Sequence, residues 1–181
     1  MSDDELYGRY LAGEESACDA LMLRHGDAVT AYLYAFLRDW QDAEDLMLEV
    51  FARILVRRPA IRPGGFKAYL FKSARHEAAR FRKKKLRLQE FSLDNAPPPA
   101  ADSSEDEFLR SERGEALRRG LENIQAQYRE PLWLVYAMGL SYAQTAAVLG
   151  CSAKKVDNLL AAGKKLLRRE LEKEGITHAL G

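Results

Sequence analysis

Three consecutive prolines, Pro97, Pro98 and Pro99, divide the helical pattern of this chain into two parts. Proline has a fixed φ and no backbone N–H, so three in succession cannot lie inside a helix and favour an extended, solvated chain. The surrounding residues 92–106 contain few bulky apolar side chains. We therefore predict a linker over residues 92–106, between an N-terminal domain of residues 1–91 and a C-terminal domain of residues 107–181.

Apolar residues recur at helical spacing on both sides of this linker, and the sequence contains no Asn-Gly or Asp-Gly hairpin pair. The spacing predicts helices near residues 6–11, 16–25, 27–38, 42–56, 66–88 and 154–173, with Asp42 as an N-cap. Ser104-x-x-Glu107 and Ser141-x-x-Gln144 are capping-box patterns, and Pro131 suits the first position of a helix that reaches residue 138. The predicted fold is all-α, with two small helical domains.

The charges nearly cancel over the 181 residues, with 28 Lys and Arg against 27 Asp and Glu. They are nevertheless distributed in blocks. Residues 1–50 contain 3 basic and 12 acidic residues, residues 66–90 contain 9 basic and 2 acidic, and residues 117–181 contain 10 basic and 6 acidic. Basic blocks in both predicted domains favour a nucleic-acid or protein partner for each, rather than a solvated surface alone.

Several classes of protein are disfavoured by what the sequence lacks. Cys18 and Cys151 form no CxxC or Cys/His cluster, which argues against a disulfide framework and a structural zinc site. Residues 132–140 are too few to span a bilayer, and residues 1–5 are acidic where a signal peptide is basic. We expect a cytoplasmic protein that does not insert into a membrane. We also expect no catalytic site, no cofactor and no metal.

Residues 142–161 have the spacing of a helix-turn-helix. Ala146 allows the close crossing of two helices, Gly150 allows positive φ in the turn, and Val156 and Leu159 can be buried against the first helix. An ordinary helical hairpin would share this spacing. Nearby cations favour DNA: Lys154 and Lys155 begin the second helix, where they could meet phosphate. Residues 157 and 158 follow them, in the segment that could reach base edges.

A basic amphipathic helix is predicted over residues 66–85. Its apolar face comprises Leu70, Ala74, Ala78 and Phe81, and its cationic face comprises Lys72, Arg75, His76, Arg80 and Lys83. Phe66 and Tyr69 lie near its start, beside a segment that contains Arg57, Arg58 and Arg62. Cations close to aromatic rings suit single-stranded nucleic acid, because charges hold the backbone and rings stack on bases. Two other interpretations are that the aromatic side chains belong to the core, and that the helix lies on a membrane.

The sequence resembles an extracytoplasmic-function (ECF) sigma factor of the sigma-70 family of bacterial RNA polymerase. The resemblance rests on LYGRYLAGEESA at residues 6–17, DAEDLMLEVF at 42–51, FKAYLFKSAR at 66–75 and GLSYAQTAAVLG at 139–150. These segments are similar to the family's opening, its polymerase-docking motif, its −10 segment and its −35 helix-turn-helix. The family layout of two helical domains joined by a linker also matches.

The resemblance implies a role for each surface. Binding to core RNA polymerase, at the clamp of its large subunit, would fall to Asp42, Glu44, Asp45, Leu46, Glu49 and Phe51. Contacts with the −10 promoter element would fall to Arg62, Phe66, Lys67, Tyr69, Lys72, Arg75, His76, Arg80 and Lys83. Contacts with the −35 element would fall to Ser141, Tyr142, Gln144, Ser152, Lys154, Lys155, Asp157, Asn158, Lys164 and Lys165. The family also suggests an anti-sigma factor as a partner.

One segment and one single residue depart from the family pattern. Residues 157–163 contain no cation, where the family often has an arginine-rich stretch, and Leu48 occupies a position where the family often has glutamine. A helix-turn-helix regulator that acts without polymerase is one alternative function, and a helical protein that sequesters part of the transcription machinery is another. The motif at residues 42–53 distinguishes them, because a plain regulator would not need it.

Overall fold

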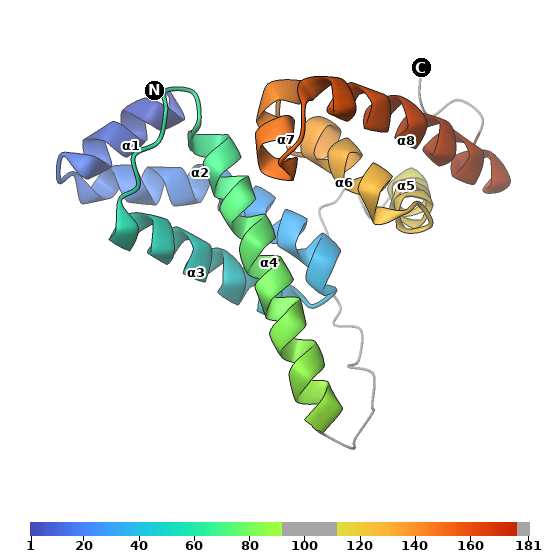
Figure 1. Cartoon of the computed structure of the whole chain (residues 1–181), viewed down its shortest axis with the longest axis horizontal. Coiled ribbons are helices and arrows are strands. Elements are labelled where there is room, and N and C mark those ends of the chain that lie inside the picture. The colour runs from blue at the N-terminus through green and yellow to red at the C-terminus, as the bar shows by residue number, and fades with distance from the viewer. Residues whose placement is uncertain (92–111, 177–181) are drawn as a thin grey trace. The chain divides into compact units, whose positions relative to one another are not determined.

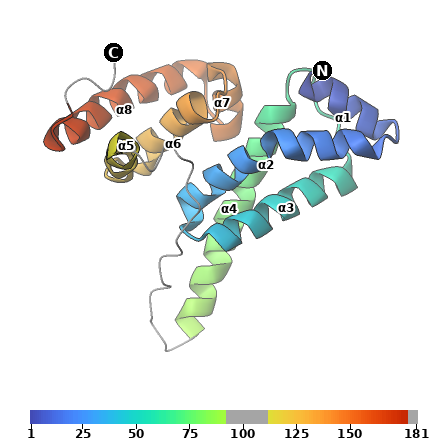
Figure 2. The same cartoon turned by 180° about the vertical axis from the view of Figure 1, so that it is seen from behind.

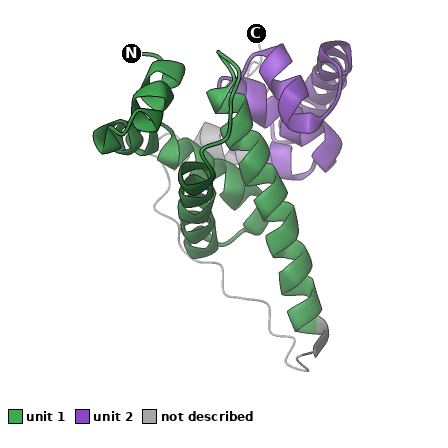
Figure 3. Cartoon of the chain, turned by 60° about the vertical axis from the view of Figure 1, so that its left-hand side comes forward, with its two compact units in different colours: residues 1–102 green, residues 103–181 purple. Residues whose placement is uncertain are grey.

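The chain folds into two compact helical units, residues 1–102 and residues 103–181 (Figure 3). The computed structural model describes residues 1–91 and 112–176. No β-strand occurs within those two ranges, so the predicted all-α class and the two-domain layout are confirmed. The predicted linker and the capping box at Ser104 lie outside the described residues, and the exact domain boundaries stay a prediction. No helix in the described ranges is both long and apolar enough to cross a membrane.

Residues 1–91, the described part of unit 1, form four helices, which are drawn in Figures 1 and 2. They are α1 (Asp3–Leu11), α2 (Glu15–Leu37), α3 (Trp40–Arg57) and α4 (Phe66–Phe91). Their apolar faces meet in one core, in which Leu33, Val50 and Leu70 are buried. The predicted apolar face of α4 is confirmed for Leu70, Ala74 and Ala78, which are all buried. The C-terminal half of α4 extends beyond the other three helices (Figure 1).

The second helix corrects the prediction of two helices over residues 16–25 and 27–38. The chain stays helical through Gly26, because Gly26 is buried against α3 and a Cβ there would lie 3.9 Å from the Met47 side chain. The Thr30 hydroxyl also donates to the Gly26 carbonyl at 2.9 Å. Tertiary packing therefore outweighs the low helix propensity of glycine, which costs about 1 kcal/mol relative to alanine.

The start of α3 is also corrected. Asp39, not Asp42, is the N-cap, and its side chain accepts a hydrogen bond from the Asp42 N–H at 2.8 Å. Both aspartates fit the composition of a helix start. The backbone decides between them, because Asp39 has the extended φ of −135° and Asp42 lies in the first helical turn.

Unit 2 contains α5 (Glu112–Glu122), α6 (Ala126–Leu132), the π-helical turn η1 (Trp133–Ala137), α7 (Tyr142–Leu149) and α8 (Ala153–Lys173). The buried residues of α8 recur every three or four positions and face the other helices; they are Val156, Leu160, Gly163, Leu167 and Leu171. The apolar stripe of α8 therefore forms one wall of the unit 2 core.

Pro131 does not begin a helix as predicted. It is buried inside α6, which begins at Ala126. Proline cannot donate the usual backbone bond and its ring crowds the preceding turn. The following residues widen into a π turn, in which the Met138 N–H reaches the Trp133 carbonyl at 3.0 Å. The chain thus continues past the proline without a new N-cap.

Candidate nucleic-acid interface

The acidic face of α3 is only partly free. Asp45 and Glu49 are exposed, whereas Asp42 forms an ion pair with Lys85 of α4 at 2.9 Å. Glu44 is half-buried and accepts a hydrogen bond from the Trp40 indole N–H at 2.9 Å. Of the four predicted acids, Asp45 and Glu49 are therefore the two whose carboxylates lie fully at the surface.

The two apolar residues named for polymerase binding, Leu46 and Phe51, pack inward. Leu46 and Phe51 are buried in the unit 1 core, because they occupy the side of α3 that packs on α2 and α4. The exposed apolar positions are instead Leu48, with 50% of its surface exposed, and Val56, with 84%. The sequence prediction missed them, although a count of 3.6 residues per turn from Asp45 would have placed them on its face.

A shallow depression of about 350 Å³ lies along the same face, lined by Glu49, Ala52, Arg53, Val56 and Arg57. The exposed surface of α3 thus combines carboxylates at its N-terminal half with apolar side chains further along. We name the residues Asp45, Leu48, Glu49, Ala52 and Val56 the α3 face. Such a mixture of apolar and charged groups is a common composition for a protein-binding surface.

The loop at residues 58–65 connects α3 to α4. Arg58 ends α3 in the left-handed conformation, with φ of 46°, and its N–H donates to the Ile54 carbonyl at 2.9 Å. Residues 62–65, Arg-Pro-Gly-Gly, form a tight turn in which the Gly65 N–H donates to the Arg62 carbonyl at 2.9 Å and Gly64 has φ of 75°. Proline followed by glycine at positive φ is the signature of a type II turn. Arg62 is exposed on this turn.

The residues predicted for −10 contacts differ in accessibility. Lys72, His76, Arg80 and Lys83 are exposed, and Lys67, Tyr69 and Arg75 are half-buried. Phe66 is only 2% exposed and packs against Tyr7 and His25, with ring centroids 5.2 and 6.2 Å away. Phe66 therefore lacks the free ring face that stacking on a base requires, and its contribution is to the core.

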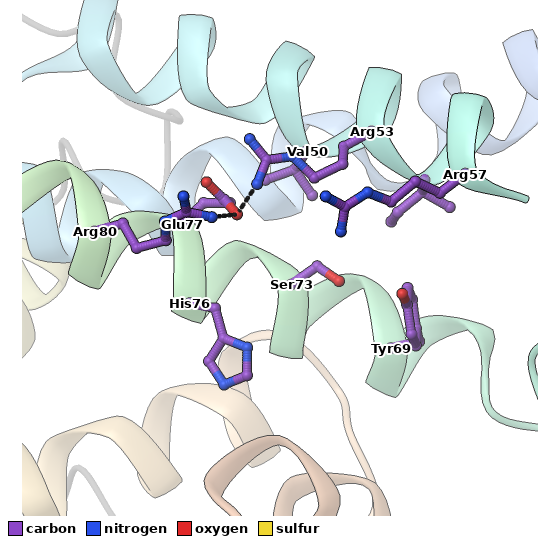
Figure 4. Close-up of a pocket in the computed structure, with 9 residues that line it drawn as sticks. Val50, Arg53, Arg57, Tyr69, Ser73, His76, Glu77 and Arg80 are labelled. Atoms are coloured by element: carbon purple, nitrogen blue, oxygen red, sulfur yellow. Dashed lines mark hydrogen bonds and ion pairs between the residues drawn. The ribbon is translucent and has the colours of Figure 1, made fainter. Parts of the chain in front are cut away.

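A polar groove of about 280 Å³ lies between α3 and α4 (Figure 4). Glu77, with only 13% of its side chain exposed, forms ion pairs with Arg53 of α3 and, at 3.4 Å, with Arg80 of α4. Figure 4 shows both guanidinium groups directed at this carboxylate. The groove is lined by Val50, Arg53, Ile54, Arg57, Tyr69, Ser73, His76, Glu77 and Arg80.

This groove is a feature that the sequence prediction did not assemble. The α3 residues Arg53 and Arg57 lie opposite Ser73 and His76 of α4 only because the two helices pack side by side. Positive charge gathered around a cavity that also holds a tyrosine ring and a hydroxyl can receive a phosphate and a base together. The sequence signal was present as arginines at 53 and 57, one turn apart on α3.

The helix-turn-helix prediction agrees with the geometry of α7 and α8. Ser141 and Gln144 form a complete capping box at the start of α7, and Gly150 ends it with φ of 69°. Ala146 and Val156 are buried where the helices cross. Leu160, not Leu159, is the next fully buried residue of α8, because it lies one turn after Val156.

The residues predicted for −35 contacts lie on the surface of this motif. Ser141, Tyr142, Ser152, Lys154, Lys155, Asp157, Asn158, Lys164 and Lys165 are exposed, and Gln144 is half-buried. The hydroxyls of Ser141 and Ser152 accept backbone N–H bonds as helix caps. Lys154, Asn158 and Lys165 share one side of α8 with Arg169, at spacings of four and seven residues. We name these four residues the α8 stripe.

Three members of the predicted −35 set, Lys154, Asp157 and Lys164, interact with other side chains of the unit. Lys154 forms an ion pair with Asp157 at 3.6 Å, with both side chains more than half exposed. The Lys164 ammonium lies 4.7 Å from the centre of the Tyr136 ring. A hydrogen bond with Tyr136 raises the pKa of Lys164, so its positive charge is retained. Tyr136, which is exposed on η1, was not among the predicted site residues.

Comparison with known protein families gives one match in each of the two units. Residues 21–88, which span most of unit 1, match Sigma-70 region 2. Residues 114–167, which contain the helix-turn-helix, match Sigma-70 region 4. Two regions of one protein family thus occur in order on one chain.

Curated relatives make the class more specific. The chain is 31% identical to the ECF RNA polymerase sigma factor BldN of Streptomyces coelicolor over 171 residues, which cover 92% of this chain and 65% of the relative. It is 28% identical to the ECF RNA polymerase sigma factor SigE of Mycolicibacterium smegmatis over 159 residues, which cover 86% of this chain and 62% of the relative. The chain thus spans slightly less than two thirds of the length of each.

A solved structure has the same fold. The sigma factor RpoE of Bartonella quintana, in complex with the anti-sigma factor NepR, superposes with a TM-score of 0.63 at 24% identity, covering 85% of this chain and 96% of that one. The chain belongs to the sigma-70 family, as an extracytoplasmic-function member. Sigma factors are transcription initiation factors.

Proposed function

We propose that this chain binds core RNA polymerase and directs it to specific promoters by contacting the −10 and −35 elements and helping to melt the DNA. The observation that carries the proposal is the occurrence of three kinds of surface on one chain: the α3 face, the groove between α3 and α4, and the helix-turn-helix. A DNA-binding regulator that acts without polymerase would have no use for the first. The proposed activity places the protein in the cytoplasm, with polymerase and chromosome.

The α3 face is the proposed polymerase-binding surface. Asp45 and Glu49 would meet a basic surface on the clamp of the large subunit, and Leu48 and Val56 would be buried by it. Association of this kind takes affinity from the buried apolar side chains and orientation from the charges. Leu46 and Phe51 act indirectly, because their burial fixes the orientation of α3.

The groove and the cationic face of α4 form the proposed −10 surface. Extruding a base costs a few kcal/mol of unstacking and unpairing, which contacts to the single strand must offset. Tyr69 offers a ring for stacking, and His76, Arg57 and Arg80 offer donors for bases and phosphates. Lys72 and Lys83 extend the cationic surface along α4 to the neighbouring backbone.

The helix-turn-helix is the proposed −35 surface. In this motif the second helix lies in the major groove with its N-terminal residues at the base edges. Lys154 and Lys155 would then contact phosphate and Asn158 would reach a base, since asparagine pairs in a bidentate manner with adenine. An anti-sigma factor is the proposed regulatory partner, by analogy with the complex of the Bartonella protein.

Charge reversal on α3 tests the docking surface. We expect Asp45→Lys with Glu49→Lys to weaken binding to core polymerase by at least about tenfold, because each reversal replaces an attraction with a repulsion. Fluorescence titration with labelled protein measures this. Asp19→Lys, an exposed acid on α2, is the matched control. Wild-type affinity in the double reversal would remove the α3 face from the docking site.

A second double variant separates melting from binding. We expect Lys72→Ala with Arg80→Ala to slow open-complex formation while core binding stays close to wild type. Run-off transcription with core enzyme and genomic fragments supplies the promoters, and permanganate footprinting measures melting. Arg119→Ala with Lys173→Ala removes two cations of unit 2 that are paired with acids and is the control. Equal loss of both activities would contradict the assignment.

A further inference from the structure

The first helix lies outside the two segments that match the family, residues 21–88 and 114–167. It nevertheless makes three polar contacts with the segment that leads from α3 to α4. Asp4, Tyr7 and Tyr10 lie three residues apart along α1, so they project from one side of the helix. All three bind backbone atoms of residues 55–64 (Figures 1 and 2 show the loop beside α1).

The first contact holds the tip of the loop. The Asp4 carboxylate accepts a hydrogen bond from the Gly64 N–H. Gly64 occupies the third position of the turn formed by residues 62–65, and the hydrogen bond of such a turn uses only its first and fourth residues. The turn itself therefore leaves the Gly64 N–H unpaired. Asp4 supplies the acceptor and fixes the turn to α1.

The other two contacts hold the base of the loop. The Tyr7 hydroxyl donates to the Pro59 carbonyl at 2.9 Å, and the Tyr10 hydroxyl donates to the Leu55 carbonyl at 3.0 Å. The last carbonyls of a helix have no partner within it, and Leu55 lies in the last turn of α3. Burial raises the pKa of Tyr7, so its hydroxyl remains a donor.

Between these anchors the backbone adopts conformations that the sequence alone does not favour. Arg58 has φ of 46°, a region that non-glycine residues occupy rarely and keep only when their surroundings enforce it. Its guanidinium lies 5.2 Å from the centre of the Tyr10 ring. At Gly65 a Cβ would lie 2.8 Å from the Arg62 carbonyl oxygen, so the turn is as tight as a glycine allows.

We propose that α1 is a brace for the loop at residues 58–65. Asp4, Tyr7 and Tyr10 are positioning residues that hold this loop, with Arg58 and Arg62, in the conformation that meets the −10 strand. That this conformation meets the −10 strand rests on the proposed function. The brace itself does not, because it concerns only the conformation of the loop.

The α1 helix is in turn fixed to α2 at its N-terminal end. The Asp3 carboxylate contacts Arg24 at 2.7 Å and the buried His25 at 2.9 Å. His25 also packs against Phe66, the first residue of α4. The brace is therefore attached to the core at its N-terminal end and to the loop along its length. Apolar packing alone would fill the core but would not supply these hydrogen bonds to the backbone of residues 55–64.

The test uses the full-length chain and compares Asp4→Ala with Tyr7→Phe, alone and combined. Hydrogen exchange at residues 58–65 should become about fivefold faster in each single variant and about thirtyfold faster in the double variant, because each hydrogen bond removed is worth roughly 1 kcal/mol, while the cores of α2 and α3 keep their protection. In holoenzyme, open-complex formation should slow by about tenfold on a promoter found with the wild type, and core affinity should stay within about twofold.

Three further variants separate positioning from general stability. Asp4→Asn keeps an oxygen acceptor for Gly64 and should restore both loop protection and melting. Glu15→Ala removes an exposed acid from the first turn of α2 and Tyr34→Phe removes a hydroxyl whose ring packs on Trp40; both should behave as wild type. Glu15→Ala removes a carboxylate, as Asp4→Ala does, and Tyr34→Phe removes a phenol hydroxyl, as Tyr7→Phe does. Within the described residues, neither Glu15 nor Tyr34 contacts the loop.

The outcomes are distinguishable. Unchanged loop exchange in the double variant overturns the brace. Faster loop exchange with wild-type melting overturns its positioning role. If the wild type initiates at no promoter, the proposed function fails, and loop exchange alone then decides whether the brace exists.

Discussion

The two cationic surfaces of this protein are built in different ways. In unit 1 the groove side chains come from two helices and are organised by Glu77, whose carboxylate holds Arg53 and Arg80. In unit 2 the α8 stripe comes from one helix, and Lys154 retains 78% exposure even while paired with Asp157. One surface is held by its own interactions, and the other is left open to solvent.

This difference fits the two tasks in the proposed function. A groove that receives an extruded base must be arranged beforehand, because ordering its side chains on binding would add to the cost of unpairing. A helix that enters an intact major groove meets a rigid partner, so exposed cations can adjust to its phosphates. Unit 1 therefore depends on internal contacts, and unit 2 depends on charge and on the position of α8.

The largest effect is expected for Gly163→Leu. A Cβ at this glycine would lie 3.0 Å from Leu132 Cδ1 and 3.2 Å from the Tyr128 carbonyl oxygen, so a leucine cannot fit without separating α8 from α6. We expect unit 2 to lose about 3 kcal/mol of unfolding free energy. Urea unfolding followed by hydrogen exchange of each unit measures it.

The same variant tests whether the two surfaces are independent. Unit 1 should keep its stability when unit 2 is destabilised. Gly8→Ala in α1, where a Cβ meets nothing within 4 Å, should instead stabilise unit 1 by roughly 0.5–1 kcal/mol. If Gly163→Leu destabilised both units equally, they would be one cooperative structure and the comparison would fail.

The next effect is expected for Glu77→Gln compared with Asp157→Asn. Glu77 is 13% exposed and binds two guanidinium groups, so its loss should cost about 1–2 kcal/mol of unit 1 stability. Asp157 is 54% exposed, and its neutralisation should change stability by less than about 0.5 kcal/mol. Thermal unfolding of both variants gives the comparison directly.

The same two variants should also differ in DNA assays, one by stronger duplex binding and the other by weaker melting. Asp157→Asn should strengthen binding to a non-specific duplex by about threefold at low salt, because it removes a repulsion near phosphate. Glu77→Gln should impair melting, because Arg53 and Arg80 lose the group that holds them. Similar behaviour in both assays would mean that the groove is no more organised than the α8 stripe.

A smaller effect is expected from the salt dependence of duplex binding. Lys154→Ala with Lys165→Ala should reduce the slope of log affinity against log salt by about 2, because each phosphate that is no longer neutralised lowers the slope by about 0.9. Filter binding of a duplex at several salt concentrations measures the slope. The pair Arg119→Ala and Lys173→Ala, which removes a cation of α5 and one at the C-terminal end of α8, outside the helix-turn-helix, should leave the slope nearly unchanged.

The smallest effect is a pH dependence at the N-terminal end of α1. Burial by itself raises the pKa of Asp3, but hydrogen bonds and charge from Arg24 and His25 outweigh it and lower the pKa below its usual 3.8. A lowered pKa in the fold means that the interaction is fully present above about pH 4 and is lost as pH falls through the folded value. Because the pair is partly exposed, we expect less than about 1 kcal/mol.

Acid titration of α1 tests this expectation. Hydrogen exchange of residues 3–11 should accelerate between about pH 4 and the acid limit in the wild type. Asp3→Asn should show faster exchange already at neutral pH and little further change on acidification. A wild-type profile that matched Asp3→Asn at every pH would show that Asp3 does not stabilise α1.

Local signals in the sequence predicted much of unit 2. The capping box at Ser141 and Gln144 and the left-handed Gly150 are set by side chains within a few residues of the atoms they bind. The start and end of α8 follow for the same reason, within one residue of the prediction. Short-range hydrogen bonds and backbone sterics carry such features, so the sequence reveals them.

Signals that compete locally were resolved only by packing. Gly26 suggested an interruption of α2 and Asp42 suggested a cap, yet burial against Met47 and the extended backbone of Asp39 decided otherwise. Phe66 could have been a stacking ring or a core residue, and its contacts with Tyr7 and His25 made it core. The choices at Gly26 and Phe66 depended on residues distant in the chain.

The sequence by itself determined the all-α class, the break between two domains and the charge blocks, because these follow from short-range periodicity and composition. The resemblance to sigma factors came from four motif segments of the same sequence. Only the tertiary structure decided which acids of α3 are exposed, how Glu77 joins Arg53 to Arg80, and that α1 holds the loop at residues 58–65. Those arrangements join residues far apart in the chain, such as Asp4 and Gly64. The free energy of such contacts is set by how whole helices pack, and no local pattern records it.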